Sequence, residues 1–390
     1  MSAAGGGPRG AVLGLLWAGL SLARSLGRAG VEVSGIVIHE HEFGLRSRYL
    51  TRRAEVLDAD ERRRDERVLE LLRKLAAAGP LFIVPERDDH VELVLRNWDE
   101  ITALGTIPLP SDPDVVHRLR RKELVLAEAE RAGVPAPQTI APEHEGDIRS
   151  AGLVPPLVVK PVEGQHFAMA FGRKVLPAAT VDEAVDAWRW ARERGFDMVV
   201  QEHVPDSHEK IFSLFTYIDR SGVARANVVG RKIRQGPVRF GTSAVFETRD
   251  EPRVLEAGLR LLESVGYRGF GHVEFAHDAR DDSFKLLEVN TRVPMWGGIA
   301  MTDLFDVARI AYDDAAGRPL PPPRTFTDEL VWIFFGKDAW VSAQMALRRE
   351  LGPLGFLAPY ARRPKVRAVF ALDDPLPAAA SVRYLAAKVV

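Results

Sequence analysis

Two glutamates and an asparagine in the second half of the chain have the types and spacing of a divalent-cation site. The apolar runs HVEFAHD and FKLLEVN flank a polar stretch over residues 279–283, a pattern that predicts a β-hairpin with a longer loop. If this hairpin is symmetric about Asp281, Glu274 and Glu288 lie directly opposite each other. The hairpin would then bring two carboxylates together.

The alternation of side chains along a strand predicts which residues share the face of Glu288. Asn290 and Arg292 follow it at intervals of two, so we expect all three on one face. The opposite face then carries the apolar residues Val273, Phe275, Leu287 and Val289. Facing carboxylates destabilise a strand pair, and hard oxygen ligands suit Mg²⁺ together with phosphate oxygens. We therefore predict a Mg²⁺ site, which Mn²⁺ can also fill, with Glu274, Glu288 and Asn290 as ligands.

A solvated strand face is the alternative interpretation. In that case the glutamates point into water, with Lys285 or Arg292 as loose partners. Lys285 is expected on the other face and the surrounding residues are strongly apolar, which favours the metal site. A register shift of one residue would separate Glu274 from Glu288.

The composition is that of a soluble globular protein. The 390 residues suffice for two or three domains, 46% of them are hydrophobic and 27% are charged, and the net charge is −1. Without a basic excess, nothing indicates a nucleic-acid partner. The absence of cysteine excludes disulfides and thiolate metal sites.

The apolar run between Arg9 and Ala23 has features of a secretory signal. However, the same pattern continues as a helix and a second strand, and cleavage after Ala23 would remove the first strand of a βαβ unit. The run is also too short for a membrane span. We therefore expect a cytoplasmic protein without a membrane partner.

The first hundred residues alternate between strand and helix patterns, which predicts a small doubly wound α/β domain. The predicted strands and helices cover residues 11–17, 19–30, 31–38, 66–79, 81–85 and 90–101. Gly10, Gly14 and Gly19 do not fit the GxGxxG pattern, so no dinucleotide site is assigned there. A proline-rich domain boundary follows over residues 106–114.

Beyond this boundary we expect a mixed α+β arrangement. The predicted strands, hairpins and helices cover residues 155–161, 181–195, 197–205, 210–233, 251–266 and 301–317. A stiff proline-rich linker over residues 318–324 precedes an amphipathic helix, a strand over residues 366–372 and a last helix.

Three motifs, in this order, carry a resemblance to a known family. They are PLVVKP, which ends a buried strand at Lys160; VVQEHV, which has the pattern of a hinge strand; and the acidic pair of Glu274 in EF and Glu288 in LLEVNTR. The ordered set, over residues 1–320, resembles the ATP-grasp superfamily. Within it, the spacing is similar to that of carboxylate-amine ligases with a pre-ATP-grasp N-terminal domain.

The resemblance implies a multidomain fold of the α/β and α+β classes. A doubly wound pre-ATP-grasp domain would cover residues 1–108, and a two-lobed ATP-grasp domain residues 109–322. Within the latter, a small ATP lobe would span residues 155–205 and a metal-binding, catalytic lobe residues 206–322. A small C-terminal α/β extension would follow over residues 323–390.

The resemblance also implies nucleotide-binding roles. Lys160 would reach the α-phosphate and adenine, and Lys122 would bind on the phosphate side. Gln201, Glu202 and Val204 would form the hinge whose backbone pairs with the adenine edge, with Glu202 reading N6. The alternatives are a lysine that snorkels from a strand end, a solvated helix face around Lys122, and a hinge strand that simply ends there.

The ribose and the phosphates are expected to meet two further segments. Glu209 is assigned to the ribose hydroxyls because a carboxylate can accept two hydrogen bonds from a vicinal diol, and Asp206 is its rival. The loop over residues 163–174 occupies the place of the family's glycine-rich flap. It departs from the family pattern because only Gly164 and Gly172 remain, and fewer glycines leave fewer backbone N–H groups for phosphate.

Basic residues concentrate between two apolar strands, at Arg231, Lys232, Arg234 and Arg239. Such a cluster would neutralise the γ-phosphate and hold an acidic substrate; an edge strand guarded by basic residues is the alternative. Lys232 and Arg234 are expected on one face, and Lys232 is favoured for phosphate. Arg292 would stabilise the transferring phosphoryl group or the acyl phosphate, so Lys232 and Arg292 are the predicted catalytic residues.

By resemblance, the chain would be an ATP-dependent ligase that forms an amide through an acyl phosphate. Two Mg²⁺ ions, one on Glu274 and Glu288 and one on Glu288 and Asn290, would offset the phosphate charge while a carboxylate attacks the γ-phosphorus. An amine would then displace phosphate. Amino acids or peptides are the expected substrates, as in D-aspartate-type ligases. His272 could serve as a base, but a structural histidine on a strand is the simpler interpretation.

Two other functions stay open. One is a bicarbonate-activating carboxylase or carbamoyl-phosphate-type enzyme, although no biotin-carrier segment is visible. The other is a non-catalytic ATP-binding sensor, which the glycine-poor flap favours and the intact acidic set disfavours. The segment 326–390 is expected to shape the acceptor side or a homodimer contact. Four of its arginines could receive an acidic acceptor, but a solvated surface is the simpler interpretation; they are Arg348, Arg349, Arg362 and Arg363.

Overall fold

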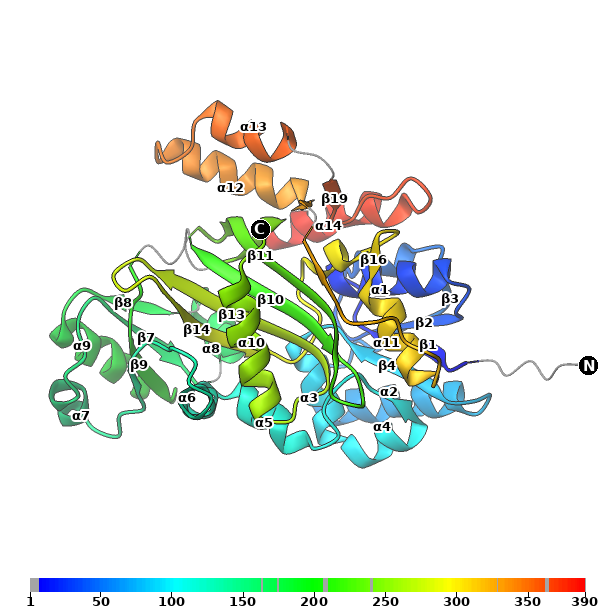
Figure 1. Cartoon of the computed structure of the whole chain (residues 1–390), viewed down its shortest axis with the longest axis horizontal. Coiled ribbons are helices and arrows are strands. Elements are labelled where there is room, and N and C mark those ends of the chain that lie inside the picture. The colour runs from blue at the N-terminus through cyan, green and yellow to red at the C-terminus, as the bar shows by residue number, and fades with distance from the viewer. Residues whose placement is uncertain are drawn as a thin grey trace, which may run out of the picture.

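The computed structural model describes most of the chain (Figure 1). The described ranges are residues 7–162, 164–173, 175–205, 210–238, 241–327, 329–361 and 365–389, without the side chains of residues 122, 123, 164, 165, 168, 169 and 387–389. None of the helices in these ranges is both long enough and apolar enough to cross a lipid bilayer.

The N-terminal domain is a parallel sheet with helices on both faces, as the alternating pattern predicts. Its strands are β1 Arg9–Leu13, β2 Val33–Val37, β3 Leu50–Glu55, β4 Leu81–Pro85 and β5 Gly105–Thr106. Its helices are α1 Trp17–Arg28, the 3₁₀ turn η1 Phe43–Arg46, α2 Glu61–Ala76, α3 Asp88–Arg96 and α4 Trp98–Leu104. The strand order is β3-β2-β1-β4-β5. Strands β2 and β3 are added on one side of β1, and β4 and β5 on the other, so the order switches between β1 and β4. The edge strand β3 is mostly exposed, and its polar sequence gave no strand signal.

A small lobe follows, built on a four-stranded sheet in the order β6-β9-β7-β8. Helices α5 Pro113–Arg120 and α6 Lys122–Arg131 lead into it. Its elements are β6 Thr139–Ile140, α7 Glu145–Ser150, β7 Leu157–Pro161, α8 Gly164–Phe171, β8 Leu176–Ala178, α9 Val181–Arg192 and β9 Met198–Glu202. One apolar core joins this sheet to its helices, and Phe167 of α8 and Trp188 of α9 belong to it.

The largest sheet runs through the middle of the molecule (Figure 1). Its order is β14-β13-β10-β11-β12-β18-β19, with β17 beside β11. The first five strands in sequence are β10 Ile211–Ile218, β11 Ala224–Gly236, β12 Thr242–Thr248, β13 Gly269–Asp278 and β14 Ser283–Asn290, with α10 Pro252–Ser264 between β12 and β13. Then come η3 Gly297–Ala300, β15 Met301–Thr302, β16 Phe305–Asp306, α11 Val307–Ala315, β17 Arg324–Phe326, β18 Val331–Ile333, α12 Phe335–Leu347, α13 Pro353–Ala361, β19 Lys365–Arg367 and α14 Leu376–Val389.

The two faces of this large sheet have different cores because side chains alternate along each strand. Leu214, Val273 and Leu286 pack with residues of α5, α6 and α10 on one face. On the other face, Phe215 and Phe246 share a core with α1 of the N-terminal domain. The N-terminal domain and the large sheet therefore share buried apolar surface, which fixes their relative positions.

A buried ion pair ties the C-terminal part of the chain to the N-terminal domain. Asp374 accepts hydrogen bonds from Nε of Arg24 at 2.9 Å, from Oγ of Ser47 at 2.7 Å and from the backbone N–H of Arg48 at 2.9 Å. The Arg24 and Asp374 side chains are 7% and 1% exposed. Burial lowers the pKa of Arg24, and the hydrogen bond and charge of Asp374 oppose this effect.

We expect Asp374→Asn to lower the free energy of unfolding by about 3–5 kcal/mol, the usual cost of leaving a buried charge unpaired. The matched control is Asp373→Asn. Asp373 pairs with Arg28, but these side chains are 41% and 42% exposed, and exposed ion pairs contribute about 0–1 kcal/mol. Urea unfolding of both variants measures the difference, and equal losses would contradict a structural role for the buried pair.

Candidate functional site

The predicted hairpin is present, and its two glutamates face each other. β13 and β14 are antiparallel; Glu274 is the cross-strand partner of Glu288, and His272 is the partner of Asn290. The predicted register is therefore confirmed at the residues that matter for the site. Glu274 is buried and Glu288 is exposed, so the pair lies where the sheet meets solvent.

A β-bulge next to Glu274 produces this register. Phe275 pairs with Leu286, whereas Glu274 pairs with Glu288, so Leu287 is the extra residue on its strand. Leu286 is fully buried in the core under the sheet, and Leu287 is only half-buried. The prediction that Leu287 turns into the core is wrong, because the bulge shifts the alternation on the turn side of Glu288.

Lys232 of β11 supplies positive charge to the buried glutamate. Its Nζ lies 2.8 Å from Oε2 of Glu274, and both side chains are 9% exposed. The lysine reaches across β10, where Ser213 is the cross-strand partner of Glu274. A buried carboxylate needs a partner of opposite charge, and Lys232 is that partner here.

Asn290 and Arg292 share the face of Glu288, as the alternation predicts. The Nδ2 amide of Asn290 donates to Oε1 of Glu288 at 3.0 Å, and Nη2 of Arg292 donates to Oδ1 of Asn290 at 3.4 Å. Arg292 also binds Asp88, the first residue of α3, through Nε at 3.0 Å and Nη2 at 2.8 Å. The structure thus gathers Lys232, Glu274, Glu288, Asn290 and Arg292 at one place.

His272 lies beside this cluster, and its imidazole ring is neutral at neutral pH. Burial lowers its pKa to about 3, and the nearby charges of Lys232 and Arg292 act in the same direction. Its Nδ1 lies 3.3 Å from Nδ2 of Asn290, and its Nε2 lies 3.4 Å from Oε1 of Glu274. The ring therefore packs against Asn290 and Glu274, which agrees with a structural role for His272.

Lys232 and Arg234 do not share a face, and the prediction that they do is wrong. A bulge in β11 lies between them: Lys232 pairs with Phe246 and Arg234 with Val245, which are consecutive residues of β12. Consecutive partners point to opposite faces. Arg234 instead binds Asp338 of α12, through Nε at 2.5 Å and Nη2 at 2.8 Å.

The predicted basic cluster is therefore divided among different partners. Arg231 binds Glu247 through Nε at 2.7 Å, and Arg249 binds the same carboxylate at 2.8 Å. Among Arg231, Lys232 and Arg234, the members of the cluster that the structure describes, Lys232 is the residue that contacts the acidic pair. Arg239 lies outside the described residues.

The small lobe brings together two of the residues assigned to the nucleotide. Nζ of Lys160 on β7 donates to Oε1 of Gln201 on β9 at 2.5 Å, and Nε2 of Gln201 donates to Oγ1 of Thr139 at 2.7 Å. Lys160 is half-buried and Gln201 is buried. This chain of hydrogen bonds holds the lysine at the end of its strand.

The hinge segment is partly occupied by the protein itself. The carboxylate of Glu202 accepts from the backbone N–H of Val154 at 2.8 Å. The backbone N–H groups of Glu202 and His203 donate to the carbonyl oxygens of Gln138 and Pro156 at 2.9 and 2.8 Å. Val204, next in sequence, is buried at 3% exposure.

Several predicted residues fall outside what the structure describes. Lys122 is the first residue of α6, but its side chain is not among the described ones. Asp206 and Glu209, the candidates for the ribose, also lie outside the described residues. The same holds for Arg362 and Arg363.

The segment in the place of the glycine-rich flap contains a helix, α8, rather than a glycine loop alone. Phe167 of α8 is fully buried and packs against Phe171, Trp190 and Phe196, at ring-centroid distances of 4.9, 6.4 and 5.2 Å. These aromatic residues thus anchor the segment to the small lobe.

The oxygen atoms of the acidic set suit a hard cation. Two carboxylates and one amide are ligand types for Mg²⁺, and the structure already places a cation, the Lys232 ammonium, against Glu274. Within the described part of the chain, no three histidine, aspartate or glutamate side chains gather as a metal site. A cation would therefore depend on Glu274, Glu288 and Asn290, with water or phosphate completing its coordination.

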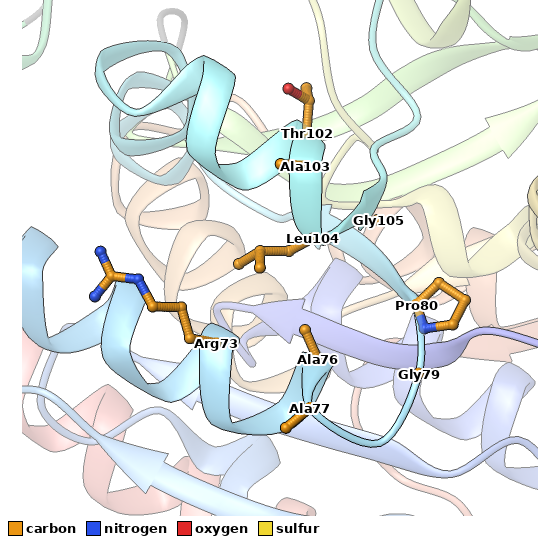
Figure 2. Close-up of a pocket in the computed structure, with 9 residues that line it drawn as sticks. All are labelled: Arg73, Ala76, Ala77, Gly79, Pro80, Thr102, Ala103, Leu104 and Gly105. Atoms are coloured by element: carbon orange, nitrogen blue, oxygen red, sulfur yellow. The ribbon is translucent and has the colours of Figure 1, made fainter.

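Two other features of the N-terminal domain include none of the predicted site residues. A shallow hollow of about 550 Å³ is lined by residues such as Pro80 and Leu104 and shares no residue with the site (Figure 2). At the start of α1, the Glu86 carboxylate accepts from the N–H groups of Leu16 and Ala18 at 2.7 and 3.0 Å. The protein's own carboxylate thus occupies the position where a dinucleotide phosphate binds in other doubly wound domains.

Asp88 is a site residue that the sequence analysis missed. It lies three residues after the end of β4, at the carboxyl end of the parallel sheet, where ligands of α/β domains commonly bind. Its signal was present in the sequence, since Asp88 and Asp89 come just after the apolar run LFIVP. The partner of Asp88 lies 204 positions further along the chain, and no local pattern identifies such a contact.

Comparison with known proteins adds a sequence relationship and a fold. The sequence model of the carbamoyl-phosphate synthase L chain, ATP binding domain, matches residues 223–321, the segment that holds the acidic pair. D-aspartate ligase of Enterococcus faecium is 23% identical over 239 residues, which are 58% of this chain and 56% of that enzyme. The match therefore spans little more than half the length of this relative.

Solved structures share the fold over most of the chain. A crystal structure of the ADP complex of N5-carboxyaminoimidazole ribonucleotide synthetase has a TM-score of 0.64 and 14% identity, covering 88% of this chain and 85% of that one. The L-amino acid ligase of Bacillus licheniformis has a TM-score of 0.60 and 15% identity, covering 80% and 75%.

We expect the unfolding free energy to fall as the pH falls from 6.5 towards 3, because His272 stays neutral in the folded protein and takes up a proton when unfolded. In His272→Asn this contribution disappears, so the loss between pH 7 and pH 5 shrinks by about 2 kcal/mol. Urea unfolding at the two pH values measures it.

His90 provides an independent comparison outside the cluster. It is fully buried, and burial likewise lowers its pKa to about 3. His90→Asn should therefore flatten the pH dependence to a similar extent. An unchanged pH dependence in His272→Asn, alongside a flattened one in His90→Asn, would contradict this by showing that the pKa of His272 is the same in the folded and the unfolded protein.

Proposed function

We propose that the chain is an ADP-forming carboxylate-amine ligase of the ATP-grasp superfamily, because residues 223–321 match the ATP-binding domain model of the carbamoyl-phosphate synthase L chain and the fold is shared with N5-carboxyaminoimidazole ribonucleotide synthetase. In this reaction a substrate carboxylate attacks the γ-phosphorus of ATP to give ADP and an acyl phosphate, and an amine then displaces phosphate to form an amide. The observation that carries the proposal is the pairing of Glu274 with Glu288, together with Lys232, Asn290 and Arg292 on the same face.

The acidic set would hold Mg²⁺, which supplies charge neutralisation for the β- and γ-phosphates. Glu274 and Glu288 present carboxylate oxygens from neighbouring strands, and Asn290 adds an amide oxygen. Lys232 places an ammonium on the same face, where it offsets the charge of the γ-phosphate. Arg292 presents a planar guanidinium that matches the oxygens of a phosphoryl group or acyl phosphate.

The nucleotide end would lie on the small lobe. Lys160 offers an ammonium at a strand end, already oriented by Gln201, and Lys122 and Glu209 are assigned to phosphate and ribose from the family resemblance. The backbone N–H groups of Glu202 and His203 are bonded within the protein. The adenine edge would therefore be read by backbone groups around Val204.

The relatives support an amino-acid or peptide substrate. One sequence relative is named a D-aspartate ligase and one structural neighbour an L-amino acid ligase. Both names describe the joining of an amino acid to a second molecule, which agrees with the proposed amide formation. Such a reaction draws on ATP and therefore fits a cytoplasmic protein.

A bicarbonate-activating enzyme is the second candidate. One observation favours it: the segment with the acidic pair matches the ATP-binding domain of the carbamoyl-phosphate synthase L chain. In that case bicarbonate would take the place of the substrate carboxylate at the same cationic face. The early phosphoryl transfer would be the same, and the acceptor would differ.

An ADP-release screen with Mg²⁺-ATP, over pools of carboxylic acids and amines and with product mass as readout, tests the proposal. ADP formation that requires both an acid and an amine supports the ligase. ADP formation that requires bicarbonate alone identifies the second candidate. Tight ATP binding without turnover across the whole library would instead indicate a non-catalytic sensor.

We expect Glu288→Gln to lower turnover by about 100-fold or more, since groups that stabilise transition-state charge each contribute on the order of 10²–10³-fold. The fold should remain, because Glu288 is exposed. The control is Glu256→Gln, which changes another exposed glutamate, on α10 of the same lobe. Wild-type turnover in Glu288→Gln would remove this residue from the metal site.

A further inference from the structure

The carboxylate of Asp88, in the N-terminal domain, contacts Arg292, the residue proposed to stabilise the transferring phosphoryl group. Asp88 begins α3, and its two oxygens accept from Nε and Nη2 of Arg292 at 3.0 and 2.8 Å. Two parallel hydrogen bonds of this kind fix the plane of a guanidinium as well as its position. Arg292 lies past the end of β14, where neither a helix nor a strand restrains its backbone.

The geometry leaves one edge of Arg292 for a ligand. Nε and Nη2 face Asp88, and Nη2 also donates to Oδ1 of Asn290 at 3.4 Å. Among the residues that the structure describes, none accepts a hydrogen bond from Nη1 of Arg292. The two Nη1 hydrogens therefore remain for an oxygen of a phosphoryl group.

Asp88 contacts a second basic element. Oδ1 of Asp88 lies 3.6 Å from Nη1 of Arg120, and Nη2 of Arg120 binds Glu92 of the same helix at 2.7 Å. Arg120 ends α5, two residues before Lys122. Helix α3 thus contacts both Arg292 and the last residue of α5, the helix that precedes Lys122.

We propose that Asp88 is a positioning residue: it orients Arg292 over Asn290 and so makes the N-terminal domain part of the phosphoryl-transfer site. This inference rests on the proposed function. It assigns no contact between Asp88 and the substrate, because Asp88 acts through the guanidinium that it holds.

The charge of Asp88 persists over the range in which enzymes work. Crowding by neighbouring protein raises its pKa, but the charge and hydrogen bonds of Arg292, with the charge of Arg120, outweigh this and lower the pKa to about 2. The ion pair between Asp88 and Arg292 is therefore fully formed at any pH above the ordinary pKa of an aspartate, and it is lost only as the pH falls towards 2. An asparagine at this position removes the charge while keeping the shape.

The same domain offers a matched control pair. Asp65 of α2 accepts from Nε and Nη2 of Arg96 at 2.9 and 3.2 Å, and Arg96 ends α3, the helix that Asp88 begins. Asp65–Arg96 is thus an equally bidentate pair at the other end of one helix. Its loss tests the structural contribution of such a pair without touching Arg292.

The experiment compares the wild type with Asp88→Asn, Asp88→Glu and Asp65→Asn. The probes are Mg²⁺-ADP alone and Mg²⁺-ADP with aluminium fluoride, which imitates the phosphoryl group in transit, and binding is followed by calorimetry. We expect Asp88→Asn to bind Mg²⁺-ADP as tightly as the wild type does. The gain in affinity that aluminium fluoride causes should be about 10- to 100-fold smaller in this variant, the range seen when groups that orient a site residue are removed. Asp88→Glu should recover part of it, and Asp65→Asn should retain all of it despite a lower melting temperature.

A double-mutant cycle with Arg292→Lys separates positioning from stability. Asp88→Asn should weaken binding of the fluoride complex no further in the Arg292→Lys background. Additive losses, a loss in Asp65→Asn as large as that in Asp88→Asn, or tighter binding in Asp88→Asn would overturn the inference.

The wild type separates this inference from the proposed function. A wild type that does not bind Mg²⁺-ADP would end the proposed function, and the role of Asp88 with it. A wild type that binds ADP and gains affinity from the fluoride, with Asp88→Asn behaving identically, would end the role of Asp88 alone.

Discussion

The repulsion between two carboxylates on neighbouring strands is the constraint around which the centre of this protein is organised. Glu274 and Glu288 are cross-strand partners on β13 and β14, and residues from other parts of the chain contact their carboxylates. Lys232 reaches over from β11 to the buried glutamate, while Asn290 donates to the exposed one. Such a concentration of charge on one face is costly for stability alone, and the proposed binding of a cation and a polyphosphate would offset that cost.

Much of this arrangement was predictable because alternation along a strand is a local rule. The hairpin, the pairing of Glu274 with Glu288 and the shared face of Asn290 and Arg292 all follow from it. The wrong predictions about strand faces come from β-bulges, which cannot be identified from residue types in this sequence. One bulge puts Leu286 instead of Leu287 into the core, and another separates Lys232 from Arg234. The first leaves the glutamate pair in place, so the pairing was predicted correctly although part of its strand was not.

Contacts between distant segments were beyond prediction. Asp88 and Arg292 are 204 positions apart, and each has ordinary local reasons to occur where it does: an acidic residue in the first turn of a helix and a basic residue after a strand. The flap segment shows the opposite case. Its loss of glycine was visible in the sequence and predicted altered behaviour, but the buried position of Phe167, which attaches this segment to the small lobe, required the three-dimensional packing.

The pair of Arg24 and Asp374 bears on how this chain is made in the cell. The two residues are separated by 350 positions, and ribosomes add roughly 5–20 residues per second, so the arginine emerges roughly 20–70 s before its counter-charge. Phe215 and Trp296, which share a core with α1, also appear late. The nascent first domain therefore waits with a bare apolar helix face and an unneutralised guanidinium, a state that favours capture by chaperones until translation ends.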